Sequence, residues 1–586
     1  MDRRFAVFGA VAARPILRAG AAAVMGIVVL SLAACRGDRH PDTSSVPSYA
    51  PFSQAAQDFA PNWSRDGRNL LYSQASGARG SLWTARAGES KGSEFLEDAG
   101  LGAWSPDGKS LAFSSGRRRA WYDVAAVLGR GGLHLWVSDA AGQHARKLTS
   151  SGGAELDAVW SPDGKRIAYT AFPGPRVAIM SSGGGDSVVF ADGLSPAWSP
   201  DGKRIAYYVC ESMLLGAHCR IAVRPVDGGA AKTLQCLALS LPALGRPSLE
   251  WSSDGKLLLT TAVEQGALNP VLLAVDEDRV ERTIAVPGSV THPRWAPDGE
   301  RIAYSFTDTA HPATIEVLTL ANGHRSQIAS ARTFAAAHLV YVKSGDLAIP
   351  SWLYLPSNAE GKHPAILWLH GGVPGTGSMP NQFEPTIQYF VENGFVVLAP
   401  NFRGSVGFGE QVEHPGQPDP LPDVAAAAAY LRTVGAVDPS RVALVGFSFG
   451  GFLTLRAITT MPDLVAAAVD FYGQSDLTAY YRHNPASRPL LNALLGGSPE
   501  QKPEVYRSLS PINLVDRIQV PVLALYGEHD PDYDEATALH QSLEKAHKNF
   551  EYISYRSAGH GFEGADDLDA TQQAMRFLRA HLGGSP

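Results

Sequence analysis

Two patterns of hydrophobic and polar residues divide the chain. In the first half, short alternating segments such as 166–169 (RIAY) and 204–207 (RIAY) follow a recurrent polar turn. Alternation at every second residue is typical of a strand with one buried face. In the second half, continuous apolar runs such as 365–369, 441–445 and 520–526 stop at glycine-rich loops. Runs of that length are typical of fully buried strands. The chain is therefore predicted to be multidomain, with an all-β part followed by an α/β part.

The polar turn is an internal repeat. Six copies of Trp-Ser/Ala-x-Asp-Gly begin at Trp63, Trp104, Trp160, Trp198, Trp251 and Trp295, at spacings of 41, 56, 38, 53 and 44 residues. Most copies contain Pro-Asp-Gly, which favours a turn because proline presets φ and glycine tolerates positive φ. A period of about forty residues with mostly strand signals predicts a β-propeller. Six blades are the direct count, and the two longest gaps leave a degenerate seventh blade as the alternative.

The motif that indicates chemistry lies between a strand and a helix. Residues 446–451 read Gly-Phe-Ser-Phe-Gly-Gly, after the apolar run 441–445 and before a helical pattern at 452–460. This order is typical of a nucleophile elbow, in which flanking glycines permit a cramped turn that exposes one serine oxygen. Ser448 is therefore the candidate nucleophile. The alternative is a glycine-rich turn that merely carries a serine.

Where a nucleophile elbow supplies the serine, an acidic residue and then a histidine follow it in the chain. Candidates for both follow Ser448. Asp530 lies just beyond the run 520–526, where ligand-facing residues of open α/β sheets are found. Asp532 and Asp534 are close by and are interpreted as solvated loop residues. His560 lies in a glycine-flanked loop after a predicted strand at 550–555. Its imidazole would accept the Ser448 proton while Asp530 fixes the tautomer.

Acyl transfer also needs N–H donors for the oxyanion, each worth about 3 to 4 kcal/mol. The backbone N–H of Phe449, directly after the nucleophile, is one candidate. The other is the N–H of Gly372, in the His370-Gly371-Gly372 loop that follows the run 365–369. We interpret His370 itself as a structural histidine at a strand end.

From about residue 340 onward, these motifs resemble the catalytic domain of the prolyl oligopeptidase family of serine peptidases. The matching pieces are the HGG loop, 401–409 (NFRGSVGFG), 438–441 (DPSR), 510–512 (SPI) and 559–561 (GHG). The resemblance implies an α/β-hydrolase domain whose triad falls on Ser448, Asp530 and His560. Phe449 stands where the family usually has tyrosine, and Val373 interrupts the usual HGGP. The six repeats resemble those of TolB-like and peptidase propellers.

The first 34 residues are expected to be a lipoprotein signal peptide. Four arginines precede an apolar core at 21–32, and Leu-Ala-Ala-Cys at 32–35 resembles a bacterial lipobox. Cys35 would then carry the lipid and attach the chain to a membrane at an extracytoplasmic face of the cell envelope. An uncleaved anchor or an ordinary signal peptide is the alternative. Residues 35–50 are expected to be a flexible tether, residues 51–332 the propeller, and residues 333–586 the hydrolase domain.

The cysteines and the net charge indicate which disulfide, metals and partners to expect. Export permits a disulfide, and Cys210 and Cys219 at the base of a predicted hairpin are the expected pair, which leaves Cys236 free. No cysteine–histidine cluster has metal-ligand spacing, so no metal and no cofactor are predicted. The net charge is −7, and residues 1–34 contribute +3 from four Arg and one Asp, which leaves −10 for the rest. Nucleic acid is not an expected partner, and the oligomeric state is left open.

The sequence and the resemblance together predict a serine peptidase that hydrolyses short peptides, with the propeller limiting substrates by size. Dipeptidyl peptidases of this family hold the substrate amino terminus with adjacent glutamates, and this chain contains no Glu-Glu dipeptide. Acylaminoacyl or oligopeptide cleavage is therefore favoured, with a hydrophobic P1 pocket around Phe471 and Tyr472. The alternatives are an esterase on the same fold and a non-catalytic propeller that binds partners. A complete triad argues against the second.

Overall fold

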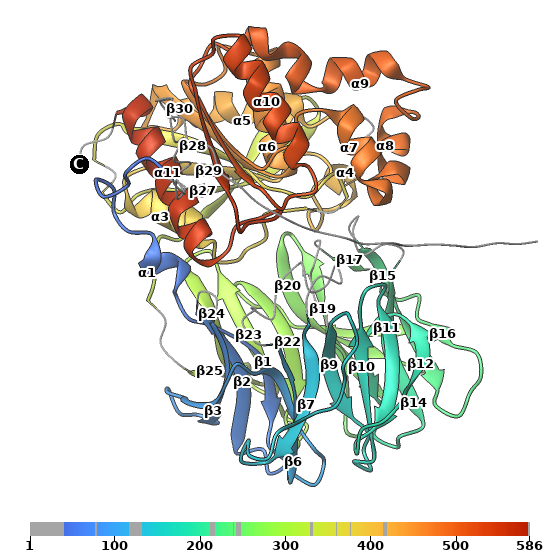
Figure 1. Ribbon diagram of the computed structural model, residues 1–586. Helices are drawn as coiled ribbons and strands as arrows, with labels where there is room; N and C mark the ends of the chain where they lie inside the picture. Colours follow the sequence, from blue (N-terminus) through green and yellow to red (C-terminus); the bar gives the residue numbers. More distant parts are fainter. Residues whose placement is uncertain are drawn as a thin grey trace, which may run out of the picture. The chain divides into compact units, whose positions relative to one another are not determined.

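The computed structural model describes residues 40–76, 79–116, 132–210, 217–237, 239–241, 248–328, 332–358, 360–375, 377–413 and 419–583 (Figure 1). From Asp42 onward these residues form one compact unit. The expected signal peptide and Cys35 lie outside the described residues. Within the described part of the chain, no helix is long and apolar enough to cross a membrane.

The first part of the chain forms six antiparallel sheets, each made of consecutive strands, which confirms the predicted six-bladed propeller. Blade 1 contains β1 (Gln57–Trp63), β2 (Asn69–Ser76), β3 (Arg79–Arg86) and β4 (Ser93–Glu97). Blade 2 contains β5 (Gly100–Trp104), β6 (Ser110–Ser115), β7 (His134–Asp139) and β8 (Arg146–Lys147). Blade 3 contains β9 (Glu155–Trp160), β10 (Arg166–Ala171), β11 (Arg176–Ser181) and β12 (Ser187–Asp192).

The other three blades repeat this arrangement. Blade 4 contains β13 (Leu194–Trp198), β14 (Arg204–Cys210), β15 (Ala217–Pro225) and β16 (Lys232–Thr233), and β17 (Leu239–Leu241) also pairs with β15. Blade 5 contains β18 (Glu250–Trp251), β19 (Leu257–Glu264), β20 (Ala267–Ala274) and β21 (Arg279–Thr283). Blade 6 contains β22 (Ser289–Trp295), β23 (Arg301–Asp308), β24 (His311–Thr319) and β25 (Arg325–Ile328).

The repeat residues join each blade to its neighbour. The Trp160 indole donates to the Ala103 carbonyl of the preceding blade at 3.0 Å, and the Arg204 guanidinium lies 4.7 Å from the ring centroid of Trp251 in the following blade. The same contacts connect blade 6 with blade 1, where the Trp63 indole donates to the Arg294 carbonyl and Arg301 lies over Trp63 at 4.9 Å. The ring is thus closed by hydrogen bonds and cation–π contacts of the repeat itself.

Inner strands of the propeller share a bulge that the sequence analysis did not predict. Three residues before the repeat tryptophan, a non-glycine residue has positive φ, and the pairing register shifts there, in five of the six blades. These residues are Ala60, Leu101, Asp157, Ser195 and His292. A bulge adds one residue to a strand and increases its local twist.

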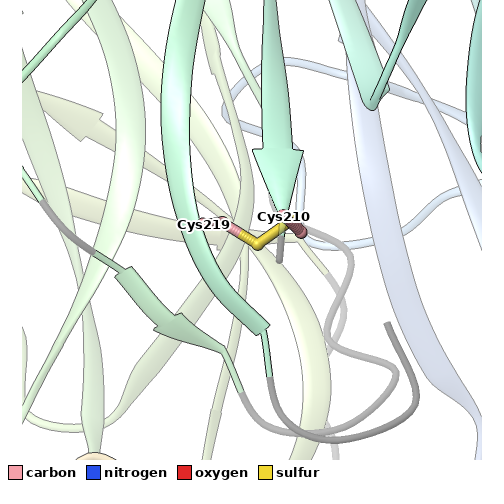
Figure 2. Close-up of a disulfide and its surroundings, with 2 residues drawn as sticks. All are labelled: Cys210 and Cys219. Atoms are coloured by element: carbon pink, nitrogen blue, oxygen red, sulfur yellow. A yellow bond between two sulfur atoms is a disulfide. The ribbon is translucent and has the colours of Figure 1, made fainter. Parts of the chain in front are cut away.

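Cys210 and Cys219 are opposite each other in β14 and β15 and form a disulfide, the pair for which the sequence analysis proposed a bridge (Figure 2). Cys236 is a free, half-buried cysteine. Burial, together with the hydrogen bond to Asp278, raises the pKa of its thiol to about 11. Cys236 is therefore protonated and poorly reactive at neutral pH.

The second part of the chain is built on an eight-stranded sheet of order β26-β27-β29-β28-β30-β31-β32-β33, antiparallel up to β29 and parallel from there on. Its strands are β26 (His338–Ser344), β27 (Leu347–Tyr354), β28 (His363–Leu369), β29 (Val396–Pro400), β30 (Val437–Phe447), β31 (Ala467–Phe471), β32 (Val522–Gly527) and β33 (Phe550–Tyr555). This is the predicted α/β-hydrolase domain.

Helices cover both faces of this sheet (Figure 1). Side chains of α5 (Leu421–Thr433), α6 (Phe449–Thr460) and α10 (Tyr533–Lys545) pack in one core, and those of α3 (Pro385–Glu392) and α11 (Gly564–Leu582) pack in the other. Leu444 and Val445 are neighbours in β30, yet they point into different cores and both are fully buried. Burial on both faces explains the continuous apolar runs.

Other described helices of this part are α4 (Glu410–Glu413), α7 (Leu477–His483), α8 (Arg488–Leu495), α9 (Pro503–Leu509) and two 3₁₀ helices at Pro485–Ser487 and Pro511–Arg517.

The expected tether through residue 50 is wrong at its C-terminal end. Tyr49 is 1% exposed, and its hydroxyl lies 2.9 Å from the hydroxyl of Thr386 in α3. Phe52, in the short helix α1 (Ala50–Ser53), packs on Tyr389 of α3, so it belongs to the hydrolase core and not to the propeller. The Pro- and Ser-rich composition predicted a tether. Burial of the Tyr49 and Phe52 rings is favourable enough to hold this end of the segment against α3 instead.

Candidate active site

Ser448 lies at the turn between β30 and α6. Its backbone has φ 53° and ψ −116°, a region that is strained for a residue with a Cβ. The Ser448 N–H donates to the Phe471 carbonyl of the neighbouring strand β31 at 2.9 Å, which helps to hold the turn. The predicted elbow is therefore present, and it directs the serine side chain away from the sheet.

The flanking glycines are required by close backbone contacts. A Cβ on Gly446 would lie 2.1 Å from the Gly450 carbonyl oxygen, and a Cβ on Gly450 would lie 2.0 Å from the Leu369 carbonyl oxygen. Both distances are far below van der Waals contact, so any side chain here would displace the backbone. Helix α6 can pack this closely on β28 and β30 only because these positions lack side chains.

A buried polar cluster supports the turn after β31. Asp470 is fully buried; its carboxylate accepts a hydrogen bond from the Gly473 N–H at 3.0 Å and one from the Tyr526 hydroxyl at 2.5 Å. Burial raises the pKa of Asp470 to about 7. The sequence analysis missed this cluster, although an aspartate inside the apolar segment 467–471 was a visible signal. The turn that it fixes carries Tyr472, whose ring contacts His560 at a centroid distance of 5.1 Å.

The structure brings the three predicted triad residues together. Ser448 Oγ lies 2.8 Å from His560 Nε2, and His560 Nδ1 lies 2.8 Å from Asp530 Oδ2. A carboxylate oxygen can only accept, so Nδ1 carries the proton and Nε2 is left to accept from the Ser448 hydroxyl. The Asp530 side chain is 2% exposed and that of His560 is 38% exposed. The acid is thus shielded from water, while the imidazole can reach a substrate.

Only one of the three neighbouring aspartates contacts His560. Asp532 Oδ1 instead accepts from the Asn484 side-chain amide at 2.6 Å. Asp532 is buried, so its interpretation as a solvated loop residue is wrong. Asp534 is exposed in the first turn of α10. Asp530, Asp532 and His560 offer oxygen and nitrogen atoms within 4.8 Å of one another, as a metal site would. Both ring nitrogens of His560 are already hydrogen-bonded, so this arrangement fits proton transfer better than metal coordination.

Two opposing effects set the pKa of His560. Burial lowers it, but the hydrogen bond and negative charge of Asp530, with a further contribution from Asp532, outweigh burial and raise the pKa above its usual value. The group that must accept a proton from Ser448 is therefore a stronger base than a free imidazole.

This shift predicts the pH dependence of activity. His560 accepts a proton only when it is neutral, and a raised pKa keeps it protonated to a higher pH. For an uncharged substrate, kcat/KM should fall as the pH is lowered, with a half-maximal value above pH ~6.5, the usual histidine value. A kinetic profile from pH 5 to 9 checks this expectation. A midpoint below pH ~6 would contradict it.

His370 is held in the loop near Ser448 by two hydrogen bonds. It is 5% exposed; its Nδ1–H donates to the Gly371 carbonyl at 2.8 Å, and its Nε2 accepts from the Ser405 hydroxyl at 2.9 Å. Burial lowers the pKa of His370 to about 4, so the ring is neutral. This agrees with the structural role that the sequence analysis assigned.

The two predicted oxyanion donors belong to segments that adjoin the nucleophile. Phe449 is the first residue of α6, so its N–H has no acceptor within the helix. The HGG loop also comes close, because a Cβ built on Gly371 would lie 3.4 Å from the Ser448 Cβ. Gly372 follows with φ 85°. The positive end of the α6 dipole also favours negative charge at this position.

A pocket of about 470 Å³ opens beside Ser448. It is lined by Trp368, His370, Gly371, Gly372, Gly377, Ser378, Met379, Glu384, Thr386, Phe447, Tyr472 and Asp567. Tyr472 lines it as predicted, but Phe471 does not: that ring is 2% exposed and stacks on Phe447 inside the core. β31 ends at Phe471, and Tyr472 follows in the turn with φ 45°, so the two rings are directed to different places. The pocket also contains two carboxylates, Glu384 and Asp567, so hydrophobic residues are only part of its lining.

Comparisons with known proteins agree with this geometry. Residues 381–585 match the model of the prolyl oligopeptidase family. The chain is 29% identical over 244 residues to the uncharacterized peptidase YtmA of Bacillus subtilis, covering 41% of this chain and 92% of that protein. It is 30% identical over 232 residues to dipeptidyl peptidase family member 6 of Caenorhabditis elegans, covering 37% of this chain but only 31% of that protein.

Solved structures show how far the likeness extends. A Pyrococcus horikoshii acylaminoacyl peptidase superposes with a TM-score of 0.71 over 92% of this chain and 98% of the other, at 17% identity. At that identity, the match shows the fold alone, and it includes the propeller. The residues that match the family model include Ser448, Asp530 and His560. Residues 381–585 therefore resemble the prolyl oligopeptidase family, and the family match and the peptidase relatives support a serine peptidase.

Proposed function

We propose that Ser448, His560 and Asp530 act as nucleophile, general base and orienting acid in peptide-bond hydrolysis. The observation that carries this proposal is the continuous hydrogen-bonded series from Asp530 Oδ2 through His560 to Ser448 Oγ, with both distances at 2.8 Å. The strained elbow that presents Ser448 supports it, since strain of this kind is found at functional sites.

The reaction follows from the positions of these atoms. Ser448 Oγ attacks the carbonyl carbon while its proton passes to His560 Nε2. The Phe449 and Gly372 N–H groups donate to the oxyanion. His560 then gives the proton to the leaving amine, and the C–N bond breaks to leave an acyl-enzyme. Water, activated in the same way by His560, attacks the ester, releases the acid and restores the Ser448 hydroxyl.

The substrates proposed are short peptides cleaved in acylaminoacyl or oligopeptide fashion. The structural likeness to an acylaminoacyl peptidase extends over the whole described architecture, and the chain lacks the paired glutamates that bind a free amino terminus. We further propose attachment to a membrane of the bacterial envelope through a lipid on Cys35. The basic residues, apolar segment and Leu-Ala-Ala-Cys sequence of residues 1–35 support that attachment.

Hydrolysis of a small substrate panel by the form that begins after Cys35 tests the substrate class. The panel contains N-acetylated aminoacyl anilides, N-blocked tripeptide anilides, free-amine dipeptide anilides and a short-chain p-nitrophenyl ester. We expect the blocked anilides to be cleaved, and free-amine dipeptides to have no advantage over them. Turnover of the ester without cleavage of any anilide would replace the peptide assignment with ester hydrolysis. A strong preference for free-amine dipeptides would identify a dipeptidyl peptidase.

A further inference from the structure

Two carboxylates that the reaction does not use lie in the pocket beside Ser448. Glu384 is the residue before α3, and Asp567 lies in the first turn of α11. Both line the pocket. The two helices are far apart in the sequence and meet on the same face of the sheet. Neither carboxylate was singled out by the sequence analysis, because nothing in the sequence brings these positions together.

No described cation neutralises this pair. Neither Glu384 nor Asp567 forms an ion pair within the described residues. Glu384 is hydrogen-bonded by Thr386, whose backbone N–H donates at 3.3 Å, and no described donor bonds to the Asp567 carboxylate. Burial, followed by the charges of Glu384 and Glu563, raises the pKa of Asp567 to about 7. Burial also raises the pKa of Glu384. Two half-buried acids without a counter-charge are unfavourable, and a bound cation would relieve that cost.

The charges of this pair reach other parts of the pocket. Burial is the main cause of the raised pKa of Tyr472, a pocket wall, and the charges of Asp567 and Glu384 raise it further. The same two charges also raise the pKa of Tyr49, whose hydroxyl lies beside that of Thr386 in α3. The two carboxylates are therefore close enough to Tyr472 and Tyr49 for their charges to act on both phenols.

The walls of the pocket suit the stem of a long basic side chain. Trp368, Phe447 and Tyr472 supply aromatic faces and edges, and Met379 is held in place because its backbone N–H and carbonyl bond the Asn401 side chain at 2.6 and 3.1 Å. Lysine and arginine bury their methylene stems against such surfaces while a cationic head reaches an acid. Aromatic walls also attract a cation directly.

The pocket is next to the reacting atoms. Phe447 directly precedes Ser448, Gly371 approaches the Ser448 Cβ, and the Tyr472 ring contacts the His560 ring. A side chain that enters the pocket therefore belongs to a residue beside the scissile bond. We propose that Glu384 and Asp567 select peptides with a lysine or arginine side chain adjacent to the scissile bond. This inference rests on the proposed role of Ser448 in peptide hydrolysis.

Two substrate series test the proposal on the form that begins after Cys35. One is acetyl-Ala-Ala-Xaa-aminomethylcoumarin with Lys, Arg, Gln or Leu at Xaa, and the other consists of internally quenched peptides with the same four residues after the scissile bond. We expect kcat/KM for Lys and Arg to exceed that for Gln by at least about tenfold in one of the series. Glu384→Gln and Asp567→Asn should each reduce this preference by about tenfold, measured as the ratio of kcat/KM for Lys or Arg to that for Gln within the same variant. Glu392→Gln, on the same helix but paired with Arg332, is the matched control and should change nothing.

Binding provides a readout that does not depend on turnover. Calorimetry on Ser448→Ala should show acetyl-Ala-Ala-Lys-amide binding at least about tenfold more tightly than acetyl-Ala-Ala-Gln-amide, and this difference should disappear when Glu384→Gln is added. Equal affinity of the two amides, or a preference that survives Glu384→Gln and Asp567→Asn, would overturn the proposal. Preference for a free α-amine over an acetylated peptide, lost in the same variants, would assign the pair to the substrate amino terminus instead. Cleavage of Leu substrates should be lost in Ser448→Ala whichever of these results is obtained. The assignment of Ser448 as nucleophile is therefore tested separately from the proposed role of Glu384 and Asp567.

Discussion

Replacing Ser448 with alanine is expected to lower kcat for peptide hydrolysis by about 10⁴- to 10⁶-fold, because the reaction then has no nucleophile while the oxyanion donors and binding pocket remain. The same change should abolish covalent labelling by a fluorophosphonate, which reacts only with an activated serine. Removal of one exposed hydroxyl at the elbow leaves the cores intact, so the unfolding temperature should change little. Labelling followed by gel fluorescence, together with kinetics on a blocked tripeptide anilide, measures both effects.

A matched control separates the elbow serine from serines in general. Ser508 is exposed on α9 and its hydroxyl bonds only the Val505 carbonyl, so Ser508→Ala should keep full labelling and full activity. Persistent labelling of Ser448→Ala would show that another residue is the nucleophile. Loss of labelling with unchanged peptide turnover would be equally damaging to the assignment.

Asp530→Asn is expected to lower kcat by about 10⁴-fold. An asparagine side chain can present its NH₂ group to His560 Nδ1, which would move the ring proton to Nε2 and prevent it from accepting from Ser448. Asp532→Asn should cost no more than about tenfold, since Asp532 bonds Asn484 and not the imidazole. Asp534→Asn, at an exposed position, should have no effect. Steady-state kinetics of the three variants under identical conditions gives the comparison.

The pH profile adds a second test of Asp530. Because the Asp530 hydrogen bond and charge are the main causes that raise the pKa of His560, the residual activity of Asp530→Asn should have its midpoint at a lower pH than the native enzyme. Asp532→Asn should shift the midpoint less. An equal loss of kcat in Asp530→Asn and Asp532→Asn, with no shift in either profile, would show that neither aspartate acts through His560.

Much of the fold was predictable because it depends on local residue chemistry that repeats or has a fixed order. The six Trp-x-x-Asp-Gly turns gave the six blades, since each copy builds its own hairpin. The apolar runs gave the buried strands, and the glycines around Ser448 gave the elbow. The family resemblance added that Asp530 and His560 belong to the same site, and the structure places them in contact.

The errors and omissions concern contacts between distant segments. Composition marked residues 35–50 as a tether, but whether Tyr49 is buried depends on Tyr389 and Thr386, more than three hundred residues later. Phe471 and Tyr472 are adjacent in sequence, but Phe471 ends β31 inside the core and Tyr472 lies in the turn after it as a pocket wall. The bulges in the inner strands left no signal, because they occur at residues as different as Ala60 and His292.

The sequence by itself determined the two-part architecture, the identity of the nucleophile candidate and the order of its partners, because turn glycines, periodic strands and motif order act over a few residues. Only the tertiary structure decided which aspartate meets His560 and that Glu384 and Asp567 share a pocket. Electrostatic and hydrogen-bond partners depend on distances of a few ångströms between residues far apart in the chain, and those distances exist only after the sheet and its helices have packed.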